Sequence, residues 1–418
     1  MTATDSAASA GISRRPEDQR RVLTVLVVSQ VLSGAGLAAG ITVGALLAQD
    51  MLGSTDLAGL PSALFTAGSA LAAVGVGRIS QARGRRPGLA AGYLTGAVGS
   101  AGVIAAAVAD SPVLLFTALF VYGAGTATNL QARYAGGDLA APAHRARAVS
   151  TVLVATTLGG VAGPNLAAPT GAFAERLGLP GLAGPFLLAG AAYGLAALVL
   201  AVWLHPDPLL LARELADGQQ TGTAQESAAP VHRPELMLGA VTMVLTQLVM
   251  AAIMTMTPVH MHDHGHGTAA SGLVIAIHVG AMYLPSPLTG WLVDRYGRRM
   301  IAAASGVTLL ASGVLAAFAP EDSVALLALA LALLGLGWNF GLVSGTAMIT
   351  DAVPLATRAR TQGVVDVAIA CAGATGGLAS GLVVSAAGYP VLGVAGGVLA
   401  LAVIPAAVLT ANRRPDPA

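Results

Sequence analysis

Long apolar stretches, separated by short polar segments, dominate the sequence. Twelve of them have the roughly 20 residues that a helix needs to cross about 30 Å of hydrocarbon. The pattern therefore predicts twelve transmembrane helices, with closely spaced pairs meeting near residues 110, 320 and 388. The expected spans cover residues 22–48, 57–77, 88–109, 112–134, 149–173, 181–204, 235–259, 270–292, 300–319, 323–350, 360–387 and 389–411.

The longest internal polar segment covers residues 205–234 and divides the spans six and six. We interpret it as a cytoplasmic linker, part helix and part flexible. The sequence thus predicts an all-α integral membrane protein with two six-helix bundles. The expected parts are an N-terminal tail (1–21), an N-terminal bundle (22–204), the linker, a C-terminal bundle (235–411) and a C-terminal tail (412–418).

The composition agrees with a membrane protein. Of the 418 residues 55% are hydrophobic and only 10% are charged, and the mean hydropathy is +0.74. Soluble domains carry about a quarter charged residues, and a nucleic-acid binder would need a basic excess, so both classes are excluded. The single cysteine, Cys371, excludes disulfide frameworks and cysteine-based metal clusters. We expect no cofactor, no enzymatic activity and no nucleic-acid partner, and the sequence leaves the oligomeric state open.

The basic residues predict how the chain lies in the bilayer. All 21 are arginines, and among them only Arg176 falls in a loop expected outside. Because cytoplasmic loops carry an excess of basic residues, we expect a multi-pass protein of the plasma (inner) membrane with both termini in the cytoplasm. The polar N-terminal tail has no cleavage site typical of a signal peptide.

Two motifs recur at one offset. GRISQARGRR begins at Gly77 and GWLVDRYGRR at Gly290, which is 213 residues later. The same offset relates a second set of residues, namely Asp138, Arg145 and Arg147 in the first half to Asp351, Arg358 and Arg360 in the second. Two matches at one offset indicate that the halves are duplicated bundles.

The motif at 290–299 resembles the G-x-L-x-D-R-x-G-R-R loop of the major facilitator superfamily. The resemblance implies that fold and transport by alternating access, in which two bundles rock around a site near the midplane. It also implies a gating role for the residues of both loops, namely Gly77, Gly84, Arg85, Gly290, Asp294, Arg295, Gly297 and Arg298. We expect Asp294 to accept hydrogen bonds from Arg298 or a helix N-terminus. Gln81 replaces the usual aspartate in the first copy, so we expect that latch to be weaker or differently paired.

Methionine and histidine are concentrated in residues 237–282. This segment holds seven of the 11 methionines and five of the eight histidines. Met250 and Met254 lie one helical turn apart in the seventh span, and His278 and Met282 one turn apart in the eighth. With a rise of about 1.5 Å per residue, Met250 and His278 are expected on neighbouring helices, each roughly 12–13 Å below the outer surface. Thioethers with an imidazole favour Cu(I) over harder cations.

These two motifs, M-x-x-x-M and H-x-x-x-M, resemble the CcoA-like copper importers of the superfamily. The resemblance implies uptake of copper, as Cu(I) or a small copper complex, by Met250, Met254, His278 and Met282. The adjoining outer loop adds a candidate capture site for the metal, comprising His260, Met261, His262, His264 and His266. The loop histidines are equally compatible with a solvated or pH-sensing turn, and methionines at helical spacing are often packing residues.

The sequence also leaves a second function open. Gly159 to Pro164 partly matches the G-x-x-x-G-P motif of proton-coupled drug antiporters, although the glycines expected after the proline are missing. That reading predicts proton-coupled efflux of an apolar small molecule. Asp366, the clearest acidic residue inside a span, is the candidate for proton coupling. It is also placed to pair with nearby arginines. No feature favours a role without transport.

Overall fold

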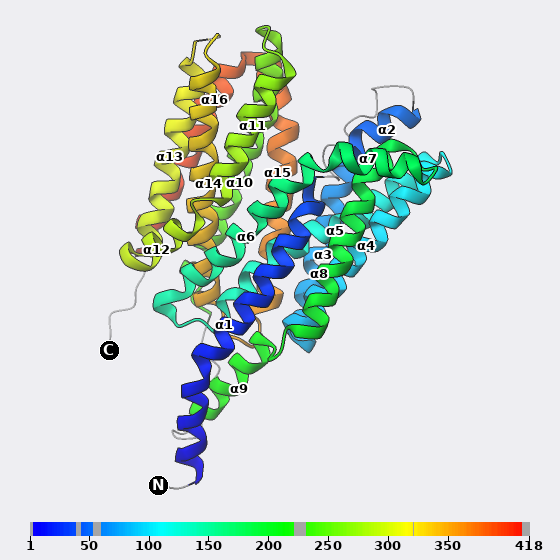
Figure 1. Cartoon of the computed structure of the whole chain (residues 1–418). Coiled ribbons are helices and arrows are strands. Elements are labelled where there is room, and N and C mark those ends of the chain that lie inside the picture. Colours follow the sequence, from blue (N-terminus) through cyan, green and yellow to red (C-terminus); the bar gives the residue numbers. More distant parts are fainter. Residues whose placement is uncertain (1–2, 39–42, 53–59, 221–230, 321, 412–418) are drawn as a thin grey trace. The chain divides into compact units, whose positions relative to one another are not determined.

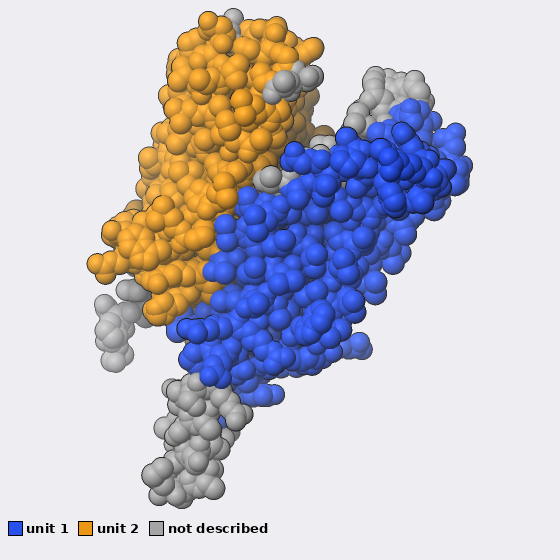
Figure 2. Space-filling model, viewed as in Figure 1, with its two compact units in different colours: residues 1–141, 151–230, 354–367 blue, residues 142–150, 231–353, 368–418 orange. Residues whose placement is uncertain are grey.

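The computed structural model describes residues 3–38, 43–52, 60–220, 231–320 and 322–411, and these form helices without any β-strand. The described chain separates into two compact units (Figure 2). Unit 1 comprises residues 1–141, 151–230 and 354–367, and unit 2 comprises 142–150, 231–353 and 368–418. Each unit therefore contains a short segment from the opposite half of the sequence.

Unit 1 is built mainly from the first half of the chain (Figure 1). Its helices are α1 (Ala3–Ala38), α2 (Gly44–Leu52), α3 (Leu60–Arg83), α4 (Arg85–Val108), α5 (Pro112–Gly137), α6 (Arg145–Asn165), α7 (Ala167–Arg176), α8 (Gly184–Trp203) and α9 (Pro208–Gln220). The start of α6 belongs to unit 2. The expected linker is helical over α9, and residues 221–230 lie outside the described residues.

Unit 2 is built mainly from the second half. Its helices are α10 (Arg233–Asp263), α11 (Thr268–Tyr283), α12 (Ser286–Tyr296), α13 (Arg298–Phe318), α14 (Val324–Ala352), α15 (Arg358–Ala387), α16 (Tyr389–Ala400) and α17 (Val403–Ala411). The first part of α15, up to residue 367, belongs to unit 1. Helix α14 packs against α10, α11 and α13 (Figure 1).

Eleven stretches of described helix are long and apolar enough to cross a membrane. The expected fifth span, residues 149–173, falls on α6 and α7, which are separated at Leu166. At two of the three points where closely spaced spans were expected to meet, near residues 110 and 320, a serine caps the second helix. Ser111 accepts a hydrogen bond from the Leu114 amide and begins α5, and Ser323 accepts one from the Leu326 amide and begins α14.

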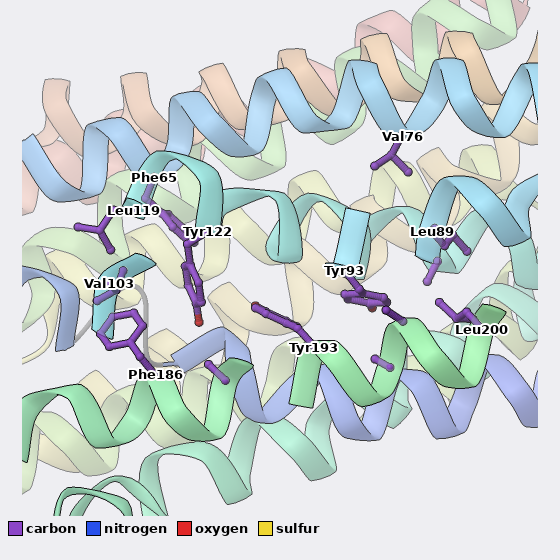
Figure 3. Packing of buried hydrophobic residues seen from close by; sticks show 14 of the residues in the cluster. Phe65, Val76, Leu89, Tyr93, Val103, Leu119, Tyr122, Phe186, Tyr193 and Leu200 are labelled. Carbon is purple, nitrogen blue, oxygen red and sulfur yellow. The ribbon is translucent and has the colours of Figure 1, made fainter. Parts of the chain in front are cut away.

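The core of unit 1 contains a group of stacked and tilted aromatic rings (Figure 3). Tyr122 contacts Phe186 and Tyr193, with ring centroids 5.5 and 5.6 Å apart, and Tyr93 stacks on Tyr193 at 5.8 Å. All four rings are fully buried. The large rings fit because glycines face them, as at Gly125, where an added Cβ would lie 2.4 Å from the Tyr193 ring.

Glycines also set the packing of α14 in unit 2. A Cβ added at Gly335 would lie 2.5 Å from the His278 carbonyl oxygen of α11, and one at Gly341 would lie 2.4 Å from the Thr246 side chain of α10. Small residues at these points let neighbouring helices approach closely, which increases their van der Waals contact. Helix α14 thus presents one close contact surface to α10 and another to α11.

Candidate functional site

The four residues of the two metal motifs lie on two helices of unit 2. Met250 and Met254 are on α10, with Met250 buried and Met254 half-buried. His278 and Met282 are on α11, and both are buried. Within each pair, the two residues therefore lie one turn apart on a continuous helix.

Helix α14 was not part of the sequence-based geometry, in which α10 and α11 were expected to be neighbours. These two helices do contact each other, but each packs far more extensively on α14, so α14 is the main partner of both. Figure 1 shows the three helices. Among the described residues, no group of three histidine, cysteine, aspartate or glutamate side chains is placed to hold a metal ion. A copper site in unit 2 would therefore depend on its methionines.

His278 has a defined orientation and one unpartnered nitrogen. Its Nδ1 lies 2.9 Å from the Leu331 carbonyl oxygen of α14. Because a carbonyl oxygen only accepts hydrogen bonds, Nδ1 carries the proton, and the neutral ring presents a lone pair at Nε2. The side chain is fully buried, and Nε2 has no hydrogen-bond partner in the described structure. A backbone carbonyl that fixes the tautomer in this way is the usual arrangement around a metal-binding histidine.

The span that carries His278 is interrupted just after Met282. Pro285 and Pro287 lack amide hydrogens, and α11 ends before them while α12 begins at Ser286. Asn339 of α14 donates to the Met282 carbonyl oxygen at 2.7 Å and to Ser286 Oγ at 2.7 Å, which stabilises the break.

The candidate capture loop is only partly exposed. Met261 is fully buried, so it is a packing residue and cannot collect metal from solvent. His260 stacks on Tyr389 with ring centroids 4.2 Å apart, and His264 packs against His260 at 4.3 Å. His262 is exposed and His266 half-buried. The loop histidines remain candidates for metal capture, with Met261 removed from the set.

In unit 2 the gating loop caps a helix. Asp294 accepts hydrogen bonds from the amides of Ala146 and Arg147 at 3.1 Å each, and it pairs with the Arg147 guanidinium at 3.4 Å. A carboxylate at a helix N-terminus is favoured by the helix dipole. Of the two partners expected for Asp294, a helix N-terminus and Arg298, it binds the helix N-terminus. Arg298 pairs instead with Asp351.

In unit 1 the repeated loop makes the same cap with a neutral side chain. Gln81 Oε1 accepts from the amide of Ala359 at 2.8 Å, and its Nε2 donates to the carbonyl oxygens of Leu355 and Ala356 at 3.2 and 2.6 Å. The amides that Gln81 binds are the repeat counterparts of those that Asp294 binds, and the two carbonyl contacts of Nε2 are additional. Whether this latch is weaker than that of Asp294 stays a prediction. Arg85 is buried and pairs with Asp138 at 2.8 Å.

The repeated glycines have two different roles. A Cβ added at Gly77 would lie 2.8 Å from the Ala359 carbonyl oxygen, and one at Gly290 would lie 2.8 Å from the Ala146 carbonyl oxygen. Both glycines therefore allow close approach of two helices. Gly84 and Gly297 have φ angles of +98° and +94°, which favour glycine. No partner is recorded for the side chain of Arg295 within the described chain.

Asp366 forms a buried ion pair in unit 1. Arg133 Nη2 lies 2.7 Å from Asp366 Oδ1, and the side chains are 0% and 4% exposed. The Tyr134 hydroxyl also donates to Oδ1 at 3.2 Å, whereas Oδ2 has no partner in the described structure. The offset of 213 residues places Thr346 and Leu153 at the corresponding positions, so this pair is not duplicated. The structure realises the pairing alternative, and proton coupling stays a prediction.

The glycines of the sixth helix have a packing role. A Cβ added at Gly159 would lie 2.3 Å from the Val31 carbonyl oxygen of α1, and one at Gly163 would lie 2.8 Å from that of Ala35. This close approach of α6 to α1 accounts for both glycines of the partial antiporter motif. The motif therefore lends the efflux alternative no further support.

Trp338 of α14 connects the two motif helices and was not found from the sequence. Its Nε1 donates to Gln247 Oε1 of α10 at 2.8 Å, and its ring packs edge-to-face with Tyr283 of α11, with centroids 5.7 Å apart. The available signal was a tryptophan inside an apolar span, one of only three in the chain. A tryptophan N–H in such a span needs an acceptor, but the sequence does not say which.

Comparisons with known proteins agree with these features. The model of the Major Facilitator Superfamily matches residues 26–285 and 239–418. The uncharacterized MFS-type transporters YdeG and YddS of Bacillus subtilis are 57% and 53% identical over 95% and 94% of this chain, and over 94% and 92% of their own length. The riboflavin transporter RfnT of Brucella anthropi is 32% identical over 83% of this chain and 85% of its own.

Solved structures show the same fold at low sequence identity. The human organic anion transporter MFSD10 (TETRAN) is similar with a TM-score of 0.76 and 16% identity, over 93% of this chain and 99% of that protein. The proton:xylose symporter XylE, bound to 6-bromo-6-deoxy-D-glucose, gives a TM-score of 0.71 and 16% identity, over 96% and 97% of the two chains. The duplicated loops, the apolar helices and these matches show that the chain belongs to the major facilitator superfamily, and it is a multi-pass membrane transporter rather than an enzyme.

Proposed function

We propose that this transporter moves copper into the cytoplasm, as Cu(I) or a small copper complex, by alternating access. The observation that supports copper most directly is His278, which is buried in a span with Nε2 unpartnered and Nδ1 held by a backbone carbonyl. A buried polar group in a span is costly unless it is partnered or functional. Copper bound at Nε2 would supply the missing partner.

The ligand chemistry suits transport of a soft cation. Met282 lies one turn from His278, and Met250 and Met254 offer two further thioethers on α10. Thioethers and a neutral imidazole select Cu(I) over Zn(II), Mn(II) or Mg(II). These ligands carry no charge, so the site would hold the ion reversibly and could release it on the other side. The proposed direction of transport, into the cytoplasm, comes from the likeness to copper importers. The arginine-rich loops mark the cytoplasmic side.

Copper binding to the purified protein tests this proposal. The full chain in detergent, kept reduced, is titrated against a chromogenic Cu(I) chelator of known affinity. Wild type is expected to compete for one Cu(I) per chain, and the His278→Ala/Met282→Ala variant is expected to lose this competition. A matched control replaces Met237, an exposed methionine of α10, with alanine and should bind as wild type does. Equal binding by all three proteins would contradict the assignment of the site.

A second candidate substrate is riboflavin or a related heteroaromatic compound. The relationship with the riboflavin transporter RfnT over 83% of this chain favours it. Uptake of radioactive riboflavin, by a host that lacks its own riboflavin transport, separates the two candidates. Uptake above the empty-vector level, together with no Cu(I) binding by the purified protein, would replace copper with riboflavin as the substrate.

A further inference from the structure

The side chain of Trp338, on α14, contacts both α10 and α11. The indole N–H donates to Gln247 of α10, and the indole ring packs edge-to-face with Tyr283 of α11 (Figure 1 shows the three helices). The side chain is 4% exposed, so water does not compete strongly for these contacts. We call Trp338, Gln247 and Tyr283 the indole bridge.

The indole bridge lies beside both metal motifs. Gln247 precedes Met250 by three residues, which places them on adjoining positions of one face of α10. Tyr283 directly follows Met282 on α11. A shift of the Trp338 side chain would therefore displace Gln247 and Tyr283, and each of these lies within one helical turn of candidate ligands on its helix.

The other contacts of α14 hold α11 by directional hydrogen bonds but hold α10 by packing. Gly335 packs against the backbone of α11 and Gly341 against the Thr246 side chain of α10, and such packing has little directional preference. Leu331 and Asn339 of α14 make polar contacts with α11 and α12, but not with α10. A directional hydrogen bond from α14 to α10 at the depth of the motifs comes from Trp338.

The amide of Gln247 is itself held in place. A Cβ added at Gly373 of α15 would lie 2.9 Å from Gln247 Nε2, so the amide packs directly against the backbone of that helix. The indole N–H binds Oε1, and Nε2 packs against α15. The indole bridge thus anchors α10 at a point one turn from Met250.

We propose that Trp338 is a positioning residue for the copper site. It fixes the distance between the methionines of α10 and the His278 and Met282 pair of α11 without touching the ion. This inference rests on the proposed function, because it requires copper to bind ligands from both helices. Cu(I) affinity should then depend on the indole N–H even though the N–H is no ligand.

The test compares Cu(I) affinity and thermal stability for the same purified full-length variants. Trp338→Phe keeps an aromatic ring next to Tyr283 and removes only the N–H donor. Gln247→Leu removes the acceptor. We expect each to weaken Cu(I) binding about tenfold, the equivalent of one hydrogen bond of about 1.4 kcal/mol. Because both changes break the same contact, the double variant should be no weaker than either single one.

Two controls separate positioning from general loss of structure. Trp291→Phe alters an exposed tryptophan of α12 and should leave Cu(I) affinity unchanged. Arg299→Met removes the ion pair with Glu235 at the start of α10, a contact of unit 2 that is distant in sequence from Met250 and His278. It should lower the melting temperature, while the affinity for Cu(I) stays at the wild-type value.

The outcomes distinguish this inference from the proposed function. If wild type binds no Cu(I), the proposed function and the inference both fail. If wild type binds Cu(I) and Trp338→Phe binds it equally well, only the positioning role is overturned. An equal loss of affinity in Arg299→Met would also overturn it, because the effect would then be general destabilisation.

Discussion

At the scale of single residues, two polar side chains buried in spans differ in how they are satisfied. His278 uses one nitrogen for α14 and leaves the other without a partner in the described structure. Asp366 is paired with Arg133, and its second oxygen is unpartnered. An unsatisfied polar group in a low-dielectric interior is costly. We therefore expect these positions to respond differently to substitution.

Replacing His278 should separate its structural role from its proposed ligand role. Asparagine can place an amide N–H near the position of Nδ1 and keep the bond to the Leu331 carbonyl oxygen, but it has no equivalent of Nε2. We expect His278→Asn to keep the wild-type melting temperature and to lose Cu(I) binding. His278→Ala should lose both binding and some stability. Copper binding by the asparagine variant at wild-type affinity would rule out Nε2 as a ligand.

Removing Asp366 should destabilise unit 1 more than removing a less buried carboxylate. Asp366→Ala leaves the buried guanidinium of Arg133 without its counter-ion, which costs about 3–5 kcal/mol. Asp351, whose side chain is 19% exposed, is the matched comparison, and Asp351→Ala should cost less. Thermal unfolding in detergent measures both. An Arg133→Met/Asp366→Leu double variant should recover most of the loss, and equal melting temperatures for the two alanine variants would contradict this prediction.

At the scale of elements, the repeated loops build the same helix cap with different side chains. Asp294 caps α6 with a carboxylate, and Gln81 caps α15 with an amide. The close approach of the helices depends on Gly77 and Gly290, since a side chain at either position meets backbone atoms. We conclude that the cap and the glycine act together to bring two helices into contact.

A methyl group at Gly290 should disturb this contact. An added Cβ would lie 2.8 Å from the Ala146 carbonyl oxygen and 2.9 Å from Arg147 Cα, so the helices must separate. We expect Gly290→Ala to reduce the transport rate severalfold while the protein still reaches the membrane. Gly280→Ala in the same span is the control, because its nearest recorded neighbour is a leucine methyl at 3.7 Å. Equal transport by both variants would show that the contact is dispensable.

Much of the element-level architecture could be predicted from the sequence. Apolar length locates the helices, and the repeated Gly and Asp spacing identifies the two loops. The position of α14 as the main partner of α10 and α11 could not be predicted, because a span that is apolar on all faces does not reveal which face packs. The sequence indicated that Asp366 could pair with an arginine, but it did not identify Arg133 as the partner, because the two residues are far apart in the chain and the pair has no duplicate in the repeat.

At the scale of the whole molecule, the two units are related by duplication but carry different chemistry. Unit 1 has buried ion pairs, Arg85 with Asp138 and Arg133 with Asp366. Unit 2 carries the methionine and histidine motifs and the indole bridge. We therefore propose that unit 2 recognises the substrate. In unit 1, the Arg133–Asp366 pair joins the first half of the chain to the second, so it would have to break and re-form if the two halves move apart during alternating access.

We propose that unit 2 recognises copper through Met250 and His278. The most direct test of this proposal is uptake of radioactive copper by cells that express wild type, a Met250→Ala/His278→Ala variant at matched membrane levels, or empty vector. We expect copper uptake above the empty-vector level for wild type, and uptake at the empty-vector level for the variant. Uptake at the vector level for all three, or equal uptake by variant and wild type, would contradict it.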